Sequence, residues 1–329
     1  MSRCAPATAR APGCTWRASS ASWRARSPII STEAGATGAA AAGRRIGFAC
    51  LVFTAAGWGM TWPVLKTVMQ ELPALTARGL GGLLAAVGLG LAALALRRPL
   101  AVPRSERLPL LVAALLNYSA WMGFSTLGLR ILSAGEGALV AYTMPVWAAL
   151  LAWPVLGERP TLARLAALGM GMGGVAVLMS GQSLSAGLEK LPGVLLVLAA
   201  ALCFALGAVL SKRRPLVLHP LTSVVWQVGI GSLPILAGAA LMEQPDWGQA
   251  SALSWGGIVY MGAVPLSLCY LTWFAALRRL PAGTAAMGTL LTPMVGMLAS
   301  AALLGEPLGW RQAVALAMTL GGVVLALRG

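Results

Sequence analysis

Ionisable side chains at the edges of long apolar runs are the residues of this sequence that could do chemistry. Lys66 ends one such run and Glu136 begins another. A charge inside hydrocarbon is costly and marks function, whereas a long side chain at a helix end can reach the interface. Lys66 is therefore either a substrate or gating residue or an interfacial one. Glu136 either binds a cationic group or a coupling proton from a buried position, or lies solvated at a helix start.

Aromatic and amide side chains recur at helical spacing inside the apolar runs. Trp58, Trp62 and Lys66 share one helical face. Because polar groups in hydrocarbon need partners, such faces should point at a cavity or at another helix, and aromatic walls can hold cations or flat metabolites. Helix packing and substrate contact both stay open for each residue. The candidate substrate-binding residues are Trp58, Trp62, Lys66, Asn117, Tyr118, Trp121, Glu136, Thr143, Trp147, Trp226, Gln227, Tyr260 and Tyr270.

Two prolines lie at equivalent depth in separate apolar runs, Pro145 and Pro293. A proline inside a helix removes one backbone hydrogen bond and bends the chain, which frees carbonyl groups nearby. The two prolines are candidate hinges, and a static kink is the alternative. Farther along the same runs, Gly157 and Gly305 are predicted C-terminal caps. We interpret the acids that follow them, Glu158 and Glu306, as structural, with basic neighbours such as Arg164 or Arg311.

Residues for catalysis, metal binding or a cofactor are scarce. The five cysteines have no paired spacing and the single histidine, His219, stands in a basic loop. This argues against a zinc site, a disulfide framework or Ser-His catalysis. The sequence also lacks a phosphate-binding loop signature. We therefore predict no catalytic residue, no metal and no cofactor.

Composition indicates an integral membrane protein. Hydrophobic residues make up 58% and charged residues 10% of the chain, and the mean hydropathy is +0.80, far from the usage of soluble domains. The net charge of +15 comes from short clusters between apolar runs. Because this distribution differs from a basic face or an aromatic-interleaved sheet, we expect contact with membrane lipid and no binding of nucleic acid.

Apolar windows as long as a bilayer is thick predict an all-α polytopic membrane protein with ten transmembrane helices. The expected spans are 46–65, 76–96, 108–127, 136–156, 162–181, 192–211, 221–241, 253–274, 282–304 and 309–327. Small residues inside the spans, such as Gly169, Gly173 and Gly81 with Ala85, are expected to let helices approach closely.

The loops alternate in charge. Loops after even-numbered spans carry clusters such as Arg97 with Arg98 and Lys212 with Arg213, whereas odd-numbered loops carry acids such as Glu243. The positive-inside rule then puts both termini in the cytoplasm, in a membrane that we expect to be a bacterial inner membrane.

The first 45 residues differ from the rest. They are rich in arginine, serine and alanine with the single acid Glu33, so they cannot bury a core and should form a disordered basic extension. A transit peptide and a start codon assigned too far upstream are both compatible with this composition.

An internal repeat relates the two halves of the chain. Leu129, Arg130 and Leu132 recur as Leu277, Arg278 and Leu280, an offset of 148 residues. The same offset relates several later residues, among them the two prolines and the two Leu-Gly-Glu segments. The predicted units are 46–181 and 192–329. Five spans in each unit make the copies enter the membrane in opposite directions, which is the architecture of many secondary transporters.

Particular motifs resemble a known family. The segment GEGALVAYTMPVWAALLAWPVLGER from Gly135, its partner GTAAMGTLLTPMVGMLASAALLGEP from Gly283 and the opening Trp58-Gly-Met-Thr-Trp-Pro-Val-Leu-Lys66 resemble the EamA branch of the drug/metabolite transporter superfamily. The resemblance covers nearly all of residues 46–329. It implies ten helices, two inverted five-helix repeats and export of amino acids or other small metabolites, with proton exchange as a family-level expectation.

The functional prediction is therefore a secondary transporter that exports a small metabolite such as an amino acid by alternating access. Two alternatives from other classes are a membrane receptor or scaffold that retains the fold without moving cargo, and a membrane-embedded enzyme. Binding without counterflow would identify the first, and an intramembrane cluster of nucleophile, base or metal ligands the second. The oligomeric state is left open.

Overall fold

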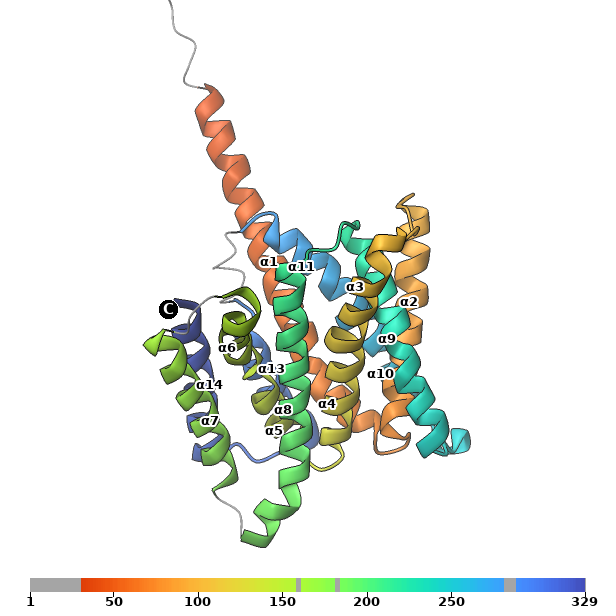
Figure 1. Cartoon of the computed structure of the whole chain (residues 1–329), viewed down its shortest axis with the longest axis vertical. Coiled ribbons are helices and arrows are strands. Elements are labelled where there is room, and N and C mark those ends of the chain that lie inside the picture. The colour runs from red at the N-terminus through yellow and green to blue at the C-terminus, as the bar shows by residue number, and fades with distance from the viewer. Residues whose placement is uncertain (1–30, 158–160, 181–183, 281–287, 329) are drawn as a thin grey trace, which may run out of the picture. The chain divides into compact units, whose positions relative to one another are not determined.

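The computed structural model describes residues 31–157, 161–180, 184–280 and 288–328, in which every regular element is a helix. Contacts divide the chain after Ala42, and residues 43–329 contain the helical bundle of Figure 1. The elements are α1 (Ser31–Val68), α2 (Ala74–Ala95), α3 (Arg104–Ala114), η1 (Leu115–Ala120), α4 (Trp121–Leu129), α5 (Ala134–Ala141), α6 (Met144–Leu156), α7 (Leu162–Met179), α8 (Leu184–Arg213), α9 (Pro220–Met242), η2 (Trp247–Gln249), α10 (Ala252–Ala263), η3 (Val264–Leu268), α11 (Cys269–Leu277), α13 (Leu291–Leu304) and α14 (Trp310–Arg328).

Helix α8 separates two groups of helices in the view of Figure 1. This helix runs along the front of the bundle, with α5, α6, α7, α13 and α14 to one side and α2, α3, α4, α9 and α10 to the other (Figure 1). Helix α8 packs against α4, α5, α6 and η1, α2 packs against α9 and α10, and α7 packs against α14.

Helix lengths and composition match a polytopic membrane protein. Among the described residues, 7 helical segments are long and apolar enough to cross a bilayer. Shorter apolar helices follow at Leu165–Leu178, Leu291–Leu304 and Trp310–Leu325. The start of the predicted ninth span, residues 282–287, lies outside the described residues, as do Glu158 and Arg159.

The first helix corrects one sequence expectation. Residues 31–45, assigned above to a disordered extension, are helical in α1. Alanine has the highest intrinsic helix propensity, and the run of four alanines that ends at Ala42 extends the helix upstream of the apolar span. Residues 1–30 of the predicted extension lie outside the described residues.

Two spans contain a π-helical turn at positions related by the 148-residue offset. η1 joins α3 to α4, and η3 joins α10 to α11. In the first, the Ser119 hydroxyl donates to the Ala114 carbonyl at 3.4 Å, and in the second the Ser267 hydroxyl donates to the Gly262 carbonyl at 2.8 Å. Such bulges change the direction in which side chains leave a helix and are frequent at functional sites.

The fourth span is broken in the middle. Helix α5 ends at Ala141, and α6 starts at Met144 with Pro145 in its first turn, where the missing N–H of proline costs no helical hydrogen bond. The structure thus places Pro145 at a helix start, where the sequence analysis expected a bend within one helix. Pro293 likewise lies in the first turn of α13.

Glycines at helix ends confirm the predicted caps. Gly157 and Gly305 have φ of 76° and 68°, the left-handed conformation that ends helices and that favours glycine. Each terminates its helix within the bundle, at α6 and α13 respectively.

The contact between α7 and α14 is reciprocal. A Cβ at Gly174 would lie 3.0 Å from the Ala315 carbonyl oxygen, and one at Gly322 would lie 2.8 Å from that of Ala167. The two pairs are related by the 148-residue offset. Gly173 and Gly81 also contact neighbouring helices, as predicted, but the prediction for Gly169 is wrong because no atom of the described residues lies within 4 Å of a Cβ there.

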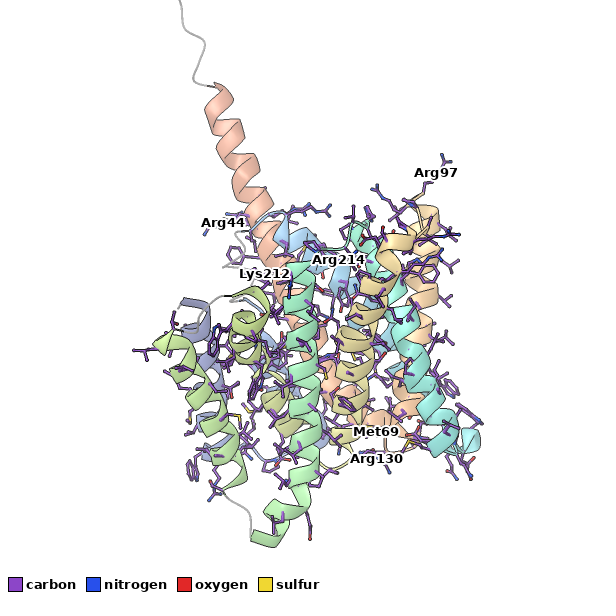
Figure 2. All side chains as sticks on the ribbon, in the orientation of Figure 1. Arg44, Met69, Arg97, Arg130, Lys212 and Arg214 are labelled. Atoms are coloured by element: carbon purple, nitrogen blue, oxygen red, sulfur yellow. The ribbon has the colours of Figure 1, made fainter. Side chains whose placement is uncertain are left out.

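Charged side chains gather at the two ends of the bundle. Figure 2 shows Arg97, Lys212 and Arg214 at one end and Met69 and Arg130 at the other. We call the first the arginine end, and the second, which contains the loops of Glu71 and Glu243, the acidic-loop end.

Candidate functional site

Four of the predicted site residues line one cavity of about 210 Å³ between η1, α9 and α11. The π turn supplies two of them, and α9 and α11 supply one each. Its walls also include Ser223 and Phe274. The four predicted residues are Asn117, Tyr118, Gln227 and Tyr270.

The amide side chains of this cavity keep free hydrogen-bonding capacity. The Gln227 amide donates to the Ser223 hydroxyl at 2.8 Å and lies 3.5 Å from the Asn117 amide nitrogen, at the outer limit of a hydrogen bond. The Asn117 carbonyl oxygen is buried without a hydrogen-bond partner in the described chain, and the Tyr118 hydroxyl is buried beside the Ser232 hydroxyl. A polar ligand in this cavity could use these groups.

Aromatic rings form one wall near the cavity. Trp58 contacts Tyr270 edge-on at 5.9 Å and Trp273 at 5.8 Å between ring centroids. The Trp58 indole N–H donates to the Pro265 carbonyl at 3.0 Å, and the Tyr260 hydroxyl donates to the Gly57 carbonyl at 3.0 Å. The Pro265 carbonyl belongs to the π turn η3 and the Gly57 carbonyl to α1, and the two bonds hold the rings in place. Trp273 was not among the predicted residues.

The cavity continues toward the arginine end. An adjoining space of about 360 Å³ shares Val224, Tyr270 and Phe274 with it and extends to Arg98 and Arg278. The cavity of the predicted polar residues thus lies next to a space that borders the arginine end of the bundle.

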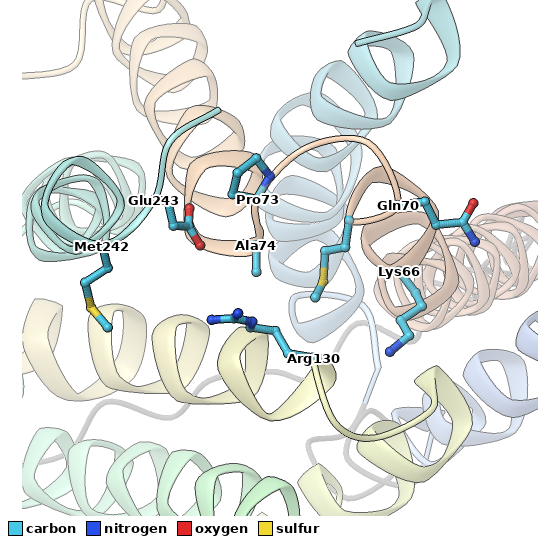
Figure 3. Close-up of a pocket in the computed structure, with 8 residues that line it drawn as sticks. Lys66, Gln70, Pro73, Ala74, Arg130, Met242 and Glu243 are labelled. Atoms are coloured by element: carbon cyan, nitrogen blue, oxygen red, sulfur yellow. The ribbon is translucent and has the colours of Figure 1, made fainter. Parts of the chain in front are cut away.

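A second cavity, of about 470 Å³, lies at the acidic-loop end. Figure 3 shows Lys66, Arg130 and Glu243 around it, with Ala74 at the start of α2 between them. The Glu243 carboxylate accepts hydrogen bonds from two backbone N–H groups in the first turn of α2, at 2.9 and 2.7 Å, so its charge stabilises a helix N-terminus.

Lys66 borders this second cavity and also caps a helix. Its ammonium donates to the carbonyls of Leu129 and Leu132, the latter at 2.8 Å, at the C-terminus of α4. A cation at this end is favourable for the helix dipole. An ammonium has three donors, so a helix-capping role leaves room for a ligand contact.

Glu136 is buried and paired. It is 8% exposed and forms a capping box with Ser133. Its carboxylate also lies 2.7 Å from the Lys190 ammonium. The Glu306 carboxylate accepts from the N–H groups of Ala134 and Gly135 at 2.6 and 2.9 Å, so this acid caps α5, where the sequence analysis expected a basic partner.

The remaining predicted residues lie apart from the first cavity. Trp62 is part of the apolar core, and Trp121 packs against Phe204 at 5.0 Å. Trp226 is 38% exposed and donates to the Leu100 carbonyl. The Trp147 indole donates to the Thr143 hydroxyl at 3.1 Å, across the break between α5 and α6.

One buried cation was missed from the sequence. Arg78 lies in α2 and is only 5% exposed. Its Nε donates to the Thr126 hydroxyl at 3.0 Å, and its Nη1 is buried with no hydrogen-bond partner in the described chain. The signal was present, because an arginine within the predicted span 76–96 is itself an intramembrane charge.

The comparison with protein families decides the class of this bundle. A model of the EamA-like transporter family matches residues 45–180 and 191–328. The chain belongs to the EamA-like transporter family. It is accordingly an integral membrane transporter of the drug/metabolite superfamily, which confirms the resemblance found in the sequence. The family match suggests a transporter rather than an enzyme.

Individual relatives agree with the family. An uncharacterized transporter of Bacillus subtilis, YvbV, is 30% identical over 78% of this chain and 84% of its own length. A Salmonella typhimurium protein named "Probable amino-acid metabolite efflux pump" is 29% identical over 87% of this chain and 93% of its own. A solved crystal structure at 20% identity has a TM-score of 0.62 and covers 87% of this chain and 97% of that one, so it shares the fold.

Proposed function

We propose that this EamA-like protein is a secondary transporter that exports a small metabolite such as an amino acid by alternating access. The observation that carries the proposal is the pair of cavities that reach into the bundle from opposite ends. Between them Tyr118 packs its ring on Gly231 of α9 and its hydroxyl on Gly82 of α2. A closed layer between two opposed cavities is what alternating access requires.

Reciprocal contacts support two inverted repeats of five helices each. Gly174 of the first unit packs on Ala315 of the second, and Gly322 of the second packs on Ala167 of the first. Gly322 is Gly174 shifted by 148 residues, and Ala315 is Ala167 shifted by the same number, so the two contacts are equivalent. This is the pattern of an interface across a twofold axis. With the two π turns at the same offset, it supports ten transmembrane helices in units 46–181 and 192–329. Rocking of these units would use Pro145 and Pro293 as hinges.

Loop charge supports an orientation. The arginine end carries the basic clusters (Figure 2), which the positive-inside rule assigns to the cytoplasm of a bacterial inner membrane. Both termini are then cytoplasmic, and the cavity of Lys66 and Arg130 opens outward.

The nature of the cargo is supported by a relative and by the cavity chemistry. The Salmonella protein is named for amino-acid metabolites, and a cavity with free amide, hydroxyl and aromatic groups suits a small polar cargo of that class. A coupling proton remains part of the proposal, with Glu136, which is buried and paired with Lys190, as the acid of the predicted site.

Flux in liposomes tests the proposal. The full-length chain, reconstituted in liposomes loaded with individual unlabelled amino acids, should accelerate uptake of the same labelled amino acid by counterflow for at least one member of the panel. Absence of substrate-dependent flux across a broad panel would contradict transport. Saturable binding without counterflow would identify a receptor or scaffold.

A further inference from the structure

Arg78 is a buried charge without a countercharge. In the described chain no carboxylate lies within 4.0 Å of its guanidinium, and its hydrogen bond goes to the neutral Thr126 hydroxyl. A buried cation with an unpaired N–H is costly, because the desolvation of the group is not compensated. A charge of this kind inside a membrane span is a candidate functional site, and an anion that binds during function would complete its hydrogen bonds.

Three acids at the acidic-loop end have partners other than Arg78. Glu243 caps the first turn of α2, and Glu306 caps α5. Glu136 is paired with Lys190. The anion that completes Arg78 is therefore expected to come from outside the chain.

Arg78 lies one helical turn below the floor of the second cavity. Ala74 and Arg130 line that cavity. Arg78 follows Ala74 by four residues in α2, and Thr126 precedes Arg130 by four in the α4 segment, so each pair shares one helical face. The hydrogen bond between Arg78 and Thr126 spans the same two helices one turn deeper.

The first cavity reaches the same layer from the other side. Tyr118 lines that cavity, and a Cβ at Gly82, one turn beyond Arg78 in α2, would lie 2.3 Å from the Tyr118 hydroxyl oxygen. The Ser232 hydroxyl of α9 lies 2.3 Å from the same Cβ position, so the Tyr118 hydroxyl is buried beside it, whereas Nη1 of Arg78 has no hydrogen-bond partner in the described chain. Arg78 thus stands in the closed layer between the two cavities.

The chemistry of this pair suits a carboxylate. A guanidinium presents a planar fork of N–H donors that binds both oxygens of a carboxylate, and a tyrosine hydroxyl can donate a further hydrogen bond. Lys66 and Arg130 at the mouth of the second cavity add positive potential that attracts an anion. We propose that Arg78 is the residue that binds the carboxylate of the cargo in the closed layer, with Tyr118 as its partner. This proposal rests on the transport function proposed above.

The first test changes the cargo and leaves the protein intact. Counterflow of labelled L-threonine, L-leucine and L-phenylalanine is measured in proteoliposomes, with each amino acid and its carboxamide as competitors. For the amino acids that the wild-type protein carries, the amide should compete at least about tenfold more weakly, because it cannot form the charge-assisted pair. Equal competition by acid and amide would overturn the role of Arg78 while leaving transport established.

The second test changes the residue. Arg78→Gln should lower the affinity for the carried amino acid at least about tenfold and remove the preference for the acid over the amide, while Arg78→Lys retains part of that preference. Exposed Arg104→Gln is the matched control and should leave both unchanged. An Arg78→Gln protein that keeps the wild-type preference would overturn the proposal. If the wild type carries none of these three but another member of the broad panel described above, the acid and its amide are compared for that amino acid. If it carries no member of the panel, the proposed transport of amino acids fails, and the carboxylate role fails with it.

Discussion

At the scale of single residues, the carboxylates of the acidic-loop end act as helix caps. Glu71, Glu243 and Glu306 each hydrogen-bond the first turn of a helix that is distant in sequence. A helix N-terminus has unpaired N–H groups and a positive dipole end, so a carboxylate satisfies both. These caps tie one helix to another without a salt bridge.

Loss of the Glu306 charge should destabilise the protein. Because its carboxylate accepts two backbone hydrogen bonds at the start of α5, Glu306→Gln should cost about 1 kcal/mol. Thermal unfolding of the purified protein in detergent measures this, with exposed Glu189→Gln as the matched control. Equal unfolding temperatures for the two variants would show that the cap carries no stability.

Glu71 should make stability depend on acid pH. Hydrogen bonds from the Ser254 hydroxyl, and then from the Ser251 backbone, hold the pKa of this carboxyl below its usual range. A depressed pKa contributes stability that is present above the unfolded-state value, near 4.3, and is lost as the pH falls through the folded-state value. Wild type should therefore unfold at a higher temperature than Glu71→Gln at pH 6, and the difference should shrink below about pH 4. A difference that is constant across this range would refute the linkage.

From the sequence, the chemical type of a candidate site residue could be predicted, but not whether its side chain lines a cavity. The sequence identifies Asn117, Tyr118, Gln227 and Tyr270 as polar groups in apolar spans, and these four line one cavity. The sequence could not distinguish these four residues from Trp62 and Trp226. The same helical spacing lets a side chain face the core, a cavity or lipid, depending on which helix packs opposite. Arg78 was missed because an interior arginine was counted with the apolar span that contains it.

At the scale of secondary-structure elements, interruptions of the helices determine the directions of the helix segments. The π turns η1 and η3 and the break before α6 occur within spans that the sequence predicts as continuous helices. Span positions followed from apolar length, as the agreement between 76–96 and α2 illustrates. The interruptions did not, because a bulge changes no hydrophobic pattern and depends on hydrogen bonds such as that from Ser119 to the Gly231 carbonyl of α9.

Substitution of a glycine at a left-handed helix cap should destabilise the protein more than substitution of a glycine within a helix. Gly305 has φ of 68°, and no atom of the part of the chain that the structure describes lies within 4 Å of a Cβ there, so Gly305→Ala should cost about 1 kcal/mol through backbone strain alone. Gly169, which is equally open but lies within α7, is the matched control, and Gly169→Ala should be neutral or stabilising. Thermal unfolding that ranks the two variants in the opposite order would contradict the cap assignment.

Close helix contact at α7 and α14 should not tolerate bulk. Gly322→Leu should destabilise the protein or prevent its folding, because even a Cβ there would lie 2.8 Å from the Ala167 carbonyl oxygen. Gly169→Leu on the open face of α7 should express and unfold like the wild type. Size-exclusion profiles and unfolding temperatures check both, and a well-folded Gly322→Leu would argue against this interface.

At the scale of the whole bundle of residues 43–329, Tyr118 and Arg78 lie between the cavity of Lys66 and Arg130 at the acidic-loop end and the cavity of Asn117 and Gln227 toward the arginine end. The offset of 148 residues, visible in the sequence, reappears in the reciprocal contacts of Gly174 and Gly322. The central claim of the proposed transport cycle is that the two units related by this offset move against each other around the closed layer.

Accessibility from the two sides of the membrane tests this claim most directly. In a variant without the five native cysteines, Gln70→Cys reports on the cavity at the acidic-loop end and Ser223→Cys on the cavity toward the arginine end. A membrane-impermeant maleimide should label Gln70→Cys in intact cells and Ser223→Cys only in inverted vesicles, and a carried amino acid should change the two labelling rates in opposite directions. Labelling of both cysteines from the same side, or rates that the amino acid leaves unchanged, would contradict the account.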